Sequence, residues 1–194
     1  MKKLILSIMT VASITAGANA QTKWTVDPSH SNVKFTITHL MVSDVDGNFK
    51  VFDGDVNAKD DTFQDALINF SVDVATVNTE SEDRDKHLRS DDFFNADKFP
   101  KMTFKSTSFK KVSGNNYKLT GNLTIRDVTK LVTFDVTFGG IIKDPWGNTK
   151  AGFKGSSSIK RTDYKLSWNK NLDAGGVVLS DEVKININVE LKKN

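Results

Sequence analysis

The strongest constraint on the fold is an alternation of apolar and polar residues that recurs along the chain. Its clearest example lies near the C-terminal end, where Val183, Ile185, Ile187, Val189 and Leu191 are interleaved with Lys184, Asn186, Asn188 and Glu190. Successive side chains of an extended strand point to opposite faces. The pattern therefore predicts an antiparallel strand with one buried face.

Similar alternation predicts several further strands. The longer runs cover 33–37, 68–74, 117–125 and 132–138, and shorter candidates cover 49–56, 102–109, 150–159 and 164–168. With the turn signals between them, we expect about eight or nine strands. Such strands form either a sandwich or a closed barrel, and periodicity does not separate the two because both bury the same alternate positions.

The segment 79–100 departs from this alternation. Thr79 is followed three residues later by Glu82, a spacing typical of a capping box at the start of a helix. Acidic Asp83 near the start and basic Arg89 further on suit the helix dipole. The sequence predicts one or two helical turns that end near Asn95 and lie across a sheet or over the opening of a barrel.

The first 20 residues have the pattern of a secretory signal peptide. Lys2 and Lys3 precede an apolar run that is too short to span a bilayer, and the small residues Ala18 and Ala20 suit cleavage after Ala20. We expect a mature domain of residues 21–194 that is periplasmic or secreted. No later segment is apolar enough to cross a membrane.

Composition narrows the class of protein further. The chain contains no cysteine, so disulfides, thiol chemistry and a lipoprotein anchor are not expected. Of the formal net charge of +3, the leader supplies two, and the nearly neutral remainder does not predict nucleic-acid binding. The 13 Phe and 3 Trp are enough to build one hydrophobic core.

The histidines do not have the spacing of a metal site. His30 and His39 would lie roughly 30 Å apart along one strand, and Asp27 and Pro28 suggest that His30 lies in the turn before that strand. Only His87 could approach either of them. We expect no metal and no cofactor, because close-spaced ligand pairs are absent.

Covalent catalysis is also poorly supported. Ser29 and Ser31 flank His30, but immediate neighbours in a strand point to opposite sides, and no GxSxG turn exposes a nucleophile. The carboxylates that cluster on 83–92 are interpreted as the solvated start of a helix.

His39 continues the inward face set by Val33, Phe35 and Ile37. Two interpretations remain open from the residues alone: a core histidine bonded to a neighbour, or a polar group at the end of an apolar cavity that meets a ligand head group. Small residues in strand phase, among them Gly121 and Gly155, hint at space inside.

Several long motifs, in order, resemble the YceI family of exported lipid-binding proteins. They are WTVDPSHSNVKF at 24–35, HLMVSDVDGNFKVFDGDV at 39–56, RDKHLRSDDFFNADKFPKMTFKST at 84–107, GNLTIRDVTK at 121–130 and IKRTDYKLSW at 159–168.

The resemblance implies an all-β fold, an extended eight-stranded antiparallel lipocalin-like barrel with a short helical insertion around residues 81–95. It implies that the barrel binds a long-chain lipid, such as a polyisoprenoid, an isoprenoid quinone, or a fatty acid or amide, without metal or catalysis. Implied lining residues are Phe35, Ile37, Phe70, Val72, Phe104, Leu123, Phe134, Val136 and Phe153. Implied polar residues at the mouth are His30, His39, Arg84, Asp85, His87 and Arg161.

Two positions depart from the family pattern. Asp127 and Lys165 stand where the family usually or often has glycine. Aspartate tolerates a left-handed turn, so we expect the hairpin at Asp127 to survive. If the family glycine at position 165 allows two backbone segments to approach closely, Lys165 would alter the geometry of the barrel there.

Two other functions compete with lipid binding. One is an enzyme that acts on an isoprenoid or lipid, with His39 or the pair Asp85 and His87 as acid and base. The other is a structural β-domain with a filled interior that acts through protein contacts. An exposed strand edge could also pair two barrels into a homodimer.

Overall fold

The structure, a computed structural model, describes residues 21–173 and 175–194. The predicted signal peptide, residues 1–20, lies outside the described residues. The strands are β1 (Thr22–Val26), β2 (Asn32–His39), β3 (Ser43–Phe49), β4 (Phe52–Ala58), β5 (Leu67–Asp73), β6 (Val77–Asn78), β7 (Lys101–Ser113), β8 (Asn116–Ile125), β9 (Val128–Lys143), β10 (Thr149–Lys160) and β11 (Leu179–Lys193). The helices are α1 (Glu82–Arg89) and three short 3-10 helices, η1 (Pro28–His30), η2 (Val74–Thr76) and η3 (Arg161–Tyr164). None of the described helices has the length and apolar character needed to cross a membrane.

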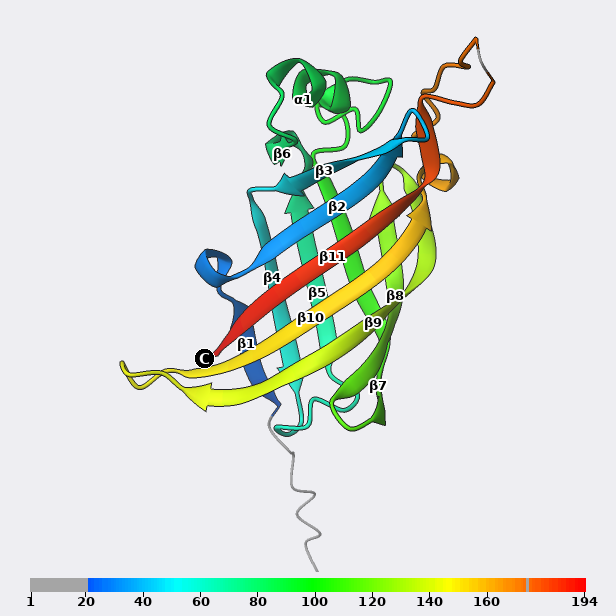
Figure 1. The fold of residues 1–194 in the computed structure, drawn as a ribbon. Helices are drawn as coiled ribbons and strands as arrows, with labels where there is room; N and C mark the ends of the chain where they lie inside the picture. Colours follow the sequence, from blue (N-terminus) through cyan, green and yellow to red (C-terminus); the bar gives the residue numbers. More distant parts are fainter. Residues whose placement is uncertain (1–20, 174) are drawn as a thin grey trace, which may run out of the picture.

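The strands close into an eight-stranded antiparallel barrel (Figure 1). Around the barrel the order is β1, β4, β5, β7, β8, β9, β10 and β11, and β11 returns to β1 through the pair Trp24↔Lys193. Closure is the solution that leaves no strand edge of this ring unpaired. The structure thus decides between the sandwich and the barrel that periodicity left open.

Three of the barrel's strands are interrupted. β1 and β2 both pair with the same edge of β11, β1 beside Leu191–Lys193 and β2 beside Leu179–Asn188. The turn η1 separates the two pieces, and similar breaks divide β3 from β4 and β5 from β6. The predicted strand 49–56 is therefore wrong in its bounds, since Lys50 and Val51 lie in the break between β3 and β4.

Alternation along β11 sets the inside and outside of the barrel. The apolar set from Val183 to Leu191 lies on the wall of an internal cavity. The interleaved polar residues point outward. On that face the Nδ2 of Asn188 donates to the Oδ1 of Asn32 in β2 at 3.0 Å. The predicted half-buried strand is confirmed.

The insertion between β6 and β7 covers one end of the barrel, at the top of Figure 1. Its helix α1 is shorter than the predicted span and ends at Arg89. The predicted capping box is wrong. The N-cap is Ser81, without a side-chain cap bond, and the Thr79 hydroxyl instead donates to Asp85 at 2.6 Å. Thr79 is buried beside that carboxylate. It therefore holds the first turn of the helix through Asp85, although it is not the N-cap residue.

The predicted strand at 164–168 is also wrong. The chain leaves the extended path of β10 in η3, and Lys165, which follows η3, takes a left-handed conformation at φ 63°. In the β8–β9 hairpin the left-handed residue is Arg126, at φ 55°, instead of the expected Asp127. The two residues that stand where the family has glycine form an ion pair, with Lys165 Nζ 2.8 Å from Asp127 Oδ2.

Candidate ligand-binding cavity

An apolar cavity of about 390 Å³ lies inside the barrel. This volume lies within the range of small-molecule binding sites, which is about 300–1,000 Å³. All nine lining residues expected from the resemblance lie on its wall: Phe35, Ile37, Phe70, Val72, Phe104, Leu123, Phe134, Val136 and Phe153. That they bind a ligand stays a prediction.

Aromatic rings close the cavity at the end away from α1. Phe63 lies at their centre, 1% exposed, with its ring 5.0 Å from that of Phe153 and 5.1 Å from that of Trp24. Phe138 stacks on Phe153 at 4.9 Å. The apolar wall therefore ends in a solid floor, which limits how deep a chain can enter.

Sequence reasoning missed Phe63. It comes from the polar loop between β4 and β5 and takes a left-handed conformation at φ 58°. Because no alternation runs through this loop, its side chain had no predicted direction. The available signal was a lone aromatic residue within the acidic segment 60–65, which a solvated loop does not require.

The opposite end carries a group of polar and charged side chains on the cavity wall. His39, Arg84, His87 and Arg161 all line the cavity there, beside Thr79. They come from β2, from the insertion and from η3. The structure thus brings together four of the six polar residues that the resemblance placed at the mouth.

Arg161 is the most buried of these groups, with 3% of the residue exposed. Its Nε donates to the carbonyl oxygen of Ser180 and its Nη1 to that of Trp168, both at 2.8 Å. Its Nη2 is buried without a hydrogen-bond partner among the described residues, and Asp181 Oδ1 lies 3.5 Å away. Burial lowers the pKa of Arg161 below its ordinary value. Because a guanidinium nevertheless stays charged in proteins, the mouth holds a cation whose Nη2 is near Asp181 but makes no hydrogen bond within the described residues.

Aromatic rings surround His87. The rings of Phe93 and Trp168 each contact its imidazole edge-on, with centroids 5.0 Å away. Its Nε2 lies 2.9 Å from Asp92 Oδ2. The hydrogen-bond partner of His87 is thus Asp92, and among the described residues no hydrogen bond joins it to Asp85.

Asp85 does not lie on the cavity wall, which corrects the expectation from the resemblance. Its Oδ1 accepts from the backbone N–H and the hydroxyl of Thr79, at 2.8 and 2.6 Å. Arg84 reaches the same residue, with Nε 2.7 Å from the Thr79 hydroxyl. Asp85 is 7% exposed because it faces Thr79, and it thereby holds α1 against the residue that follows β6.

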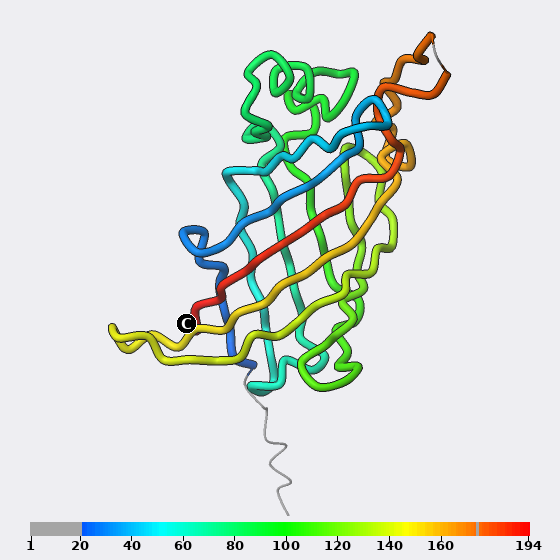
Figure 2. Tube along the Cα trace, in the orientation of Figure 1, coloured from blue at the N-terminus to red at the C-terminus, as the bar shows by residue number. Residues whose placement is uncertain are grey.

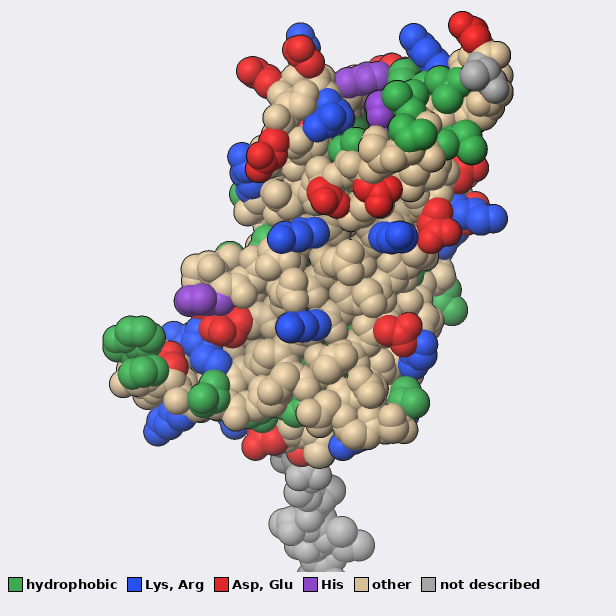
Figure 3. Space-filling model, viewed as in Figure 1, with side chains coloured by type: hydrophobic (Ala, Val, Ile, Leu, Met, Phe, Trp, Pro, Cys, Tyr) green, Lys and Arg blue, Asp and Glu red, His purple; other side chains and the backbone are tan. Residues whose placement is uncertain are grey.

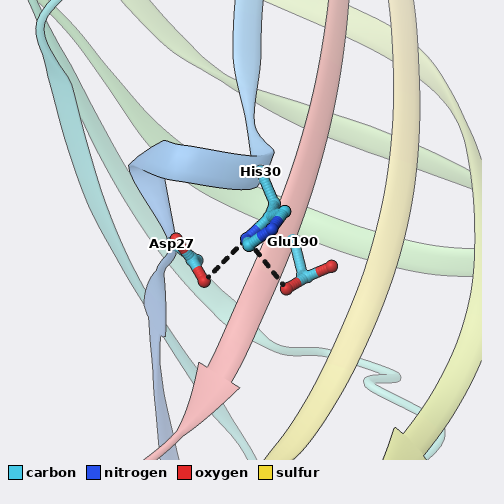
Figure 4. Close-up of side chains that lie close together, drawn as sticks. All are labelled: Asp27, His30 and Glu190. Carbon is cyan, nitrogen blue, oxygen red and sulfur yellow. Dashed lines mark hydrogen bonds and ion pairs between the residues drawn. The ribbon is translucent and has the colours of Figure 1, made fainter. Parts of the chain in front are cut away.

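His30 does not lie at the mouth either. It lies in η1 on the outer surface, with its side chain 64% exposed, and its Nδ1 is 3.2 Å from Asp27 Oδ2 (Figure 4). The turn that breaks the first barrel strand faces solvent, so His30 points away from the cavity. The expectation that it meets a head group is wrong in its geometry.

The group around His30 includes potential metal ligands. Three such atoms lie within 4.8 Å of one another, one from each of Asp27, His30 and Glu190. The ammonium of Lys150 already contacts both carboxylates, 2.6 Å from Asp27 and 3.0 Å from Glu190. Its hydrogen bond to Asp27 holds the pKa of that carboxyl far below the ordinary value. The lysine cation therefore offsets one of the two carboxylate charges that would attract a metal.

Comparison with known proteins agrees with the geometry. The family model described as the YceI-like domain matches residues 24–191. A UPF0312 protein of Staphylococcus aureus (strain N315) is 39% identical over 170 residues, which cover 87% of this chain and 96% of the relative.

Solved structures show the same barrel. BcnA of Burkholderia cenocepacia superposes with a TM-score of 0.74 at 25% identity, over 85% of this chain and 98% of its own. A YceI protein of Campylobacter jejuni superposes with a TM-score of 0.70 at 35% identity, over 81% of this chain and 90% of its own. A structure described as a polyisoprenoid binding domain from Saccharophagus degradans shares the fold, with a TM-score of 0.67 at 15% identity, over 88% and 98% of the two chains. From the matched motifs, the relatives and the barrel, the chain belongs to the YceI-like family.

Proposed function

We propose that the protein is an exported binding protein that holds one long-chain apolar ligand inside its barrel, for transport, storage or sequestration. The observation that carries this proposal is the cavity itself, which is apolar along its wall, closed by rings at one end and polar at the other. Burial of each CH₂ group contributes about 0.8 kcal/mol, so a chain of ten or so carbons gains ample transfer free energy before entropic losses.

The polar end favours a particular kind of head group. The charged side chains that line the mouth are cationic, Arg84 and Arg161, and His39 and His87 lie beside them. A head group that accepts hydrogen bonds, such as a quinone carbonyl, a carboxylate or an amide oxygen, would accept from Nη2 of Arg161, which makes no hydrogen bond within the described residues. The solved relative described as a polyisoprenoid binding domain supports a prenyl chain as one candidate.

The N-terminal pattern supports export. A basic start, a short apolar run and small residues before Gln21 suit a cleaved leader. We place the mature protein in the periplasm or outside the cell, where an apolar ligand needs a carrier to cross water.

Native mass spectrometry of the purified protein tests the proposal. We expect a co-purifying species with the mass of a long-chain compound, and uptake of a fluorescent fatty acid after it is removed. The variant Gly155→Leu places a larger side chain in the cavity and should abolish uptake, whereas Ser156→Leu on the outer face should keep it. A folded wild-type protein that holds no such compound and takes up neither fatty nor prenyl probes would overturn the proposal.

A further inference from the structure

The hairpin between β2 and β3 exposes three apolar side chains at its tip. Leu40, Met41 and Val42 are 39%, 66% and 84% exposed. Leu40 and Met41 also take left-handed conformations, at φ 50° and 61°. Such a conformation is unfavourable for an L-residue, and Gly or Asn adopts it at lower cost. Apolar residues at these positions therefore lower stability in two ways, through their exposure to water and through their left-handed backbone.

A second loop, whose described residues are 170–173 and 175–178, packs against this tip. The Leu40 N–H donates to the carbonyl oxygen of Val178 at 2.8 Å, and the side chain of Met41 fills the space beside Gly176. The loop is held by an antiparallel bridge between Asn171 and Val177. We call the tip and this loop together the rim knob. Figures 1 and 2 show its two parts side by side at the upper right, and Figure 3 shows hydrophobic side chains gathered there.

The rim knob continues the wall of the cavity outward. His39 and Val178 line the cavity, and Leu40 is joined to both, to one by the chain and to the other by a hydrogen bond. An apolar chain that left the cavity at this end would pass directly beside the exposed side chains of the tip.

Charge and size limit what the rim knob can contact. The tip carries no charge, and the described part of loop 170–178 carries one lysine and one aspartate, Lys170 and Asp173. Electrostatic attraction therefore selects no partner. A stable dimer buries about 800 Å² on each partner, far more than three side chains expose. Small apolar protrusions of this kind instead suit shallow insertion into a lipid surface.

We propose that the rim knob docks the protein on a lipid bilayer, with Met41 and Val42 inserted below the head groups and the cavity mouth turned toward the membrane. This inference rests on the proposed function, because a bound chain then passes between bilayer and cavity without crossing water. Since the contact is apolar, attachment should be weak, reversible and nearly independent of salt and of anionic lipid.

Flotation with phosphatidylcholine vesicles tests the docking. The protein is purified from the exported fraction and its N-terminus read by mass spectrometry, because an uncleaved apolar leader would itself bind vesicles. The double variant Met41→Ser/Val42→Ser should partition about tenfold or more weakly than the wild type. The matched control Leu131→Ser/Ile142→Ser removes side chains that are 65% and 70% exposed elsewhere on the surface and should bind as the wild type does.

A cysteine probe locates the contact. Because the chain contains no cysteine, Val42→Cys and Ile142→Cys each provide a single labelling site for a polarity-sensitive dye. Vesicles should shift the emission of the dye at position 42 to the blue and leave that at position 142 unchanged. Equal shifts, vesicle binding that the rim-knob variant retains, or binding lost only in the Leu131/Ile142 control would each overturn the proposal, as would a self-associating protein that ignores vesicles.

The two proposals can fail separately. Uptake of a fatty acid probe from solution depends on the cavity, and neither Met41 nor Val42 lines it. A rim-knob variant that still takes up the probe but binds vesicles as the wild type does refutes the docking alone. A protein that floats through the rim knob yet never takes up the probe refutes the proposed function alone.

Discussion

At the scale of single residues, Lys150 determines the state of the group around His30. Its side chain is only 11% exposed and bridges Asp27 and Glu190 on the outer wall of the barrel. The hydrogen bond from Lys150, followed by that from Ser29, holds the pKa of Asp27 far below its ordinary value of 3.8. The same contact raises the pKa of Lys150 above 10.5. The pair thus stabilises the fold between these values and loses that contribution as the pH falls below the first or rises past the second.

Replacing Lys150 by Met should lower the free energy of unfolding at pH 7 by about 1–2 kcal/mol, since both charges are partly reached by water. The pKa of the Asp27 carboxyl then rises toward its ordinary value, while the bonds from Ser29 and His30 still lower it. The variant should therefore lose less stability than the wild type when the pH falls from about 5 to about 2. Urea unfolding across this range measures the two slopes.

Lys143→Met is the matched control, because Lys143 is exposed on the same hairpin. It should change neither the stability at pH 7 nor the acid slope. Parallel acid slopes for the wild type and the Lys150 variant would show that Asp27 is not the group responsible.

At the scale of the strands, phenylalanines of one strand cover glycines of the next. Phe35 of β2 lies over Gly47 of β3, and Phe104 of β7 lies over Gly121 of β8. A Cβ at either glycine would overlap the ring. Gly121 therefore leaves no space in the cavity, which corrects the hint drawn from its size, whereas Gly155 lies on the wall and a Cβ there would make only ordinary contacts.

Gly47→Ala should cost about 1–3 kcal/mol of stability, because the ring of Phe35 must move off its neighbour. The comparison is Gly155→Ala, whose Cβ would lie 3.8 Å from Val136 Cγ2, an ordinary contact. That change should be neutral or stabilise by up to about 1 kcal/mol. Denaturant unfolding of both variants checks the contrast, and equal effects would contradict the packing argument.

At the scale of the whole molecule, aromatic side chains close the barrel cavity at one end, and the insertion covers the other end. Asp85 accepts two bonds from Thr79 that hold α1 against the start of the insertion, and Arg126 of the β8–β9 hairpin donates to the carbonyl oxygen of Phe93 at 3.0 Å. Local opening of such a segment takes less free energy than global unfolding. The insertion can therefore control how fast a ligand leaves.

Asp85→Ala should speed dissociation of a bound fluorescent fatty acid by about tenfold, because the Thr79 donors lose a buried acceptor worth about 1–3 kcal/mol. Stopped-flow displacement measures the rate, and hydrogen exchange over 82–98 reports the opening. Asp83→Ala, exposed on the same helix, is the control and should leave both unchanged. An unchanged off-rate together with faster exchange would exclude the insertion as the gate.

Strand phase predicted which side chains point into the barrel, and the family resemblance implied that these side chains line a cavity. Phe35, Ile37, Val136 and the others reach the wall because period-2 alternation reports the side of a strand to which each residue points. His39 followed from the same count. The direction of Arg161 did not, because η3 turns it inward where the strand would have ended.

The amino-acid sequence by itself determined an all-β domain of alternating strands, the inward set of each strand and the short helical insertion. Only the tertiary structure decided that His30 lies outside beside Lys150, that Phe63 seals the floor, and that Leu40 and Val178 meet at the rim. The physical reason is that alternation is a local property of an extended chain, whereas these contacts depend on how turns and loops return in space. A residue's side of the strand can be read along the chain, but its partners across the barrel cannot.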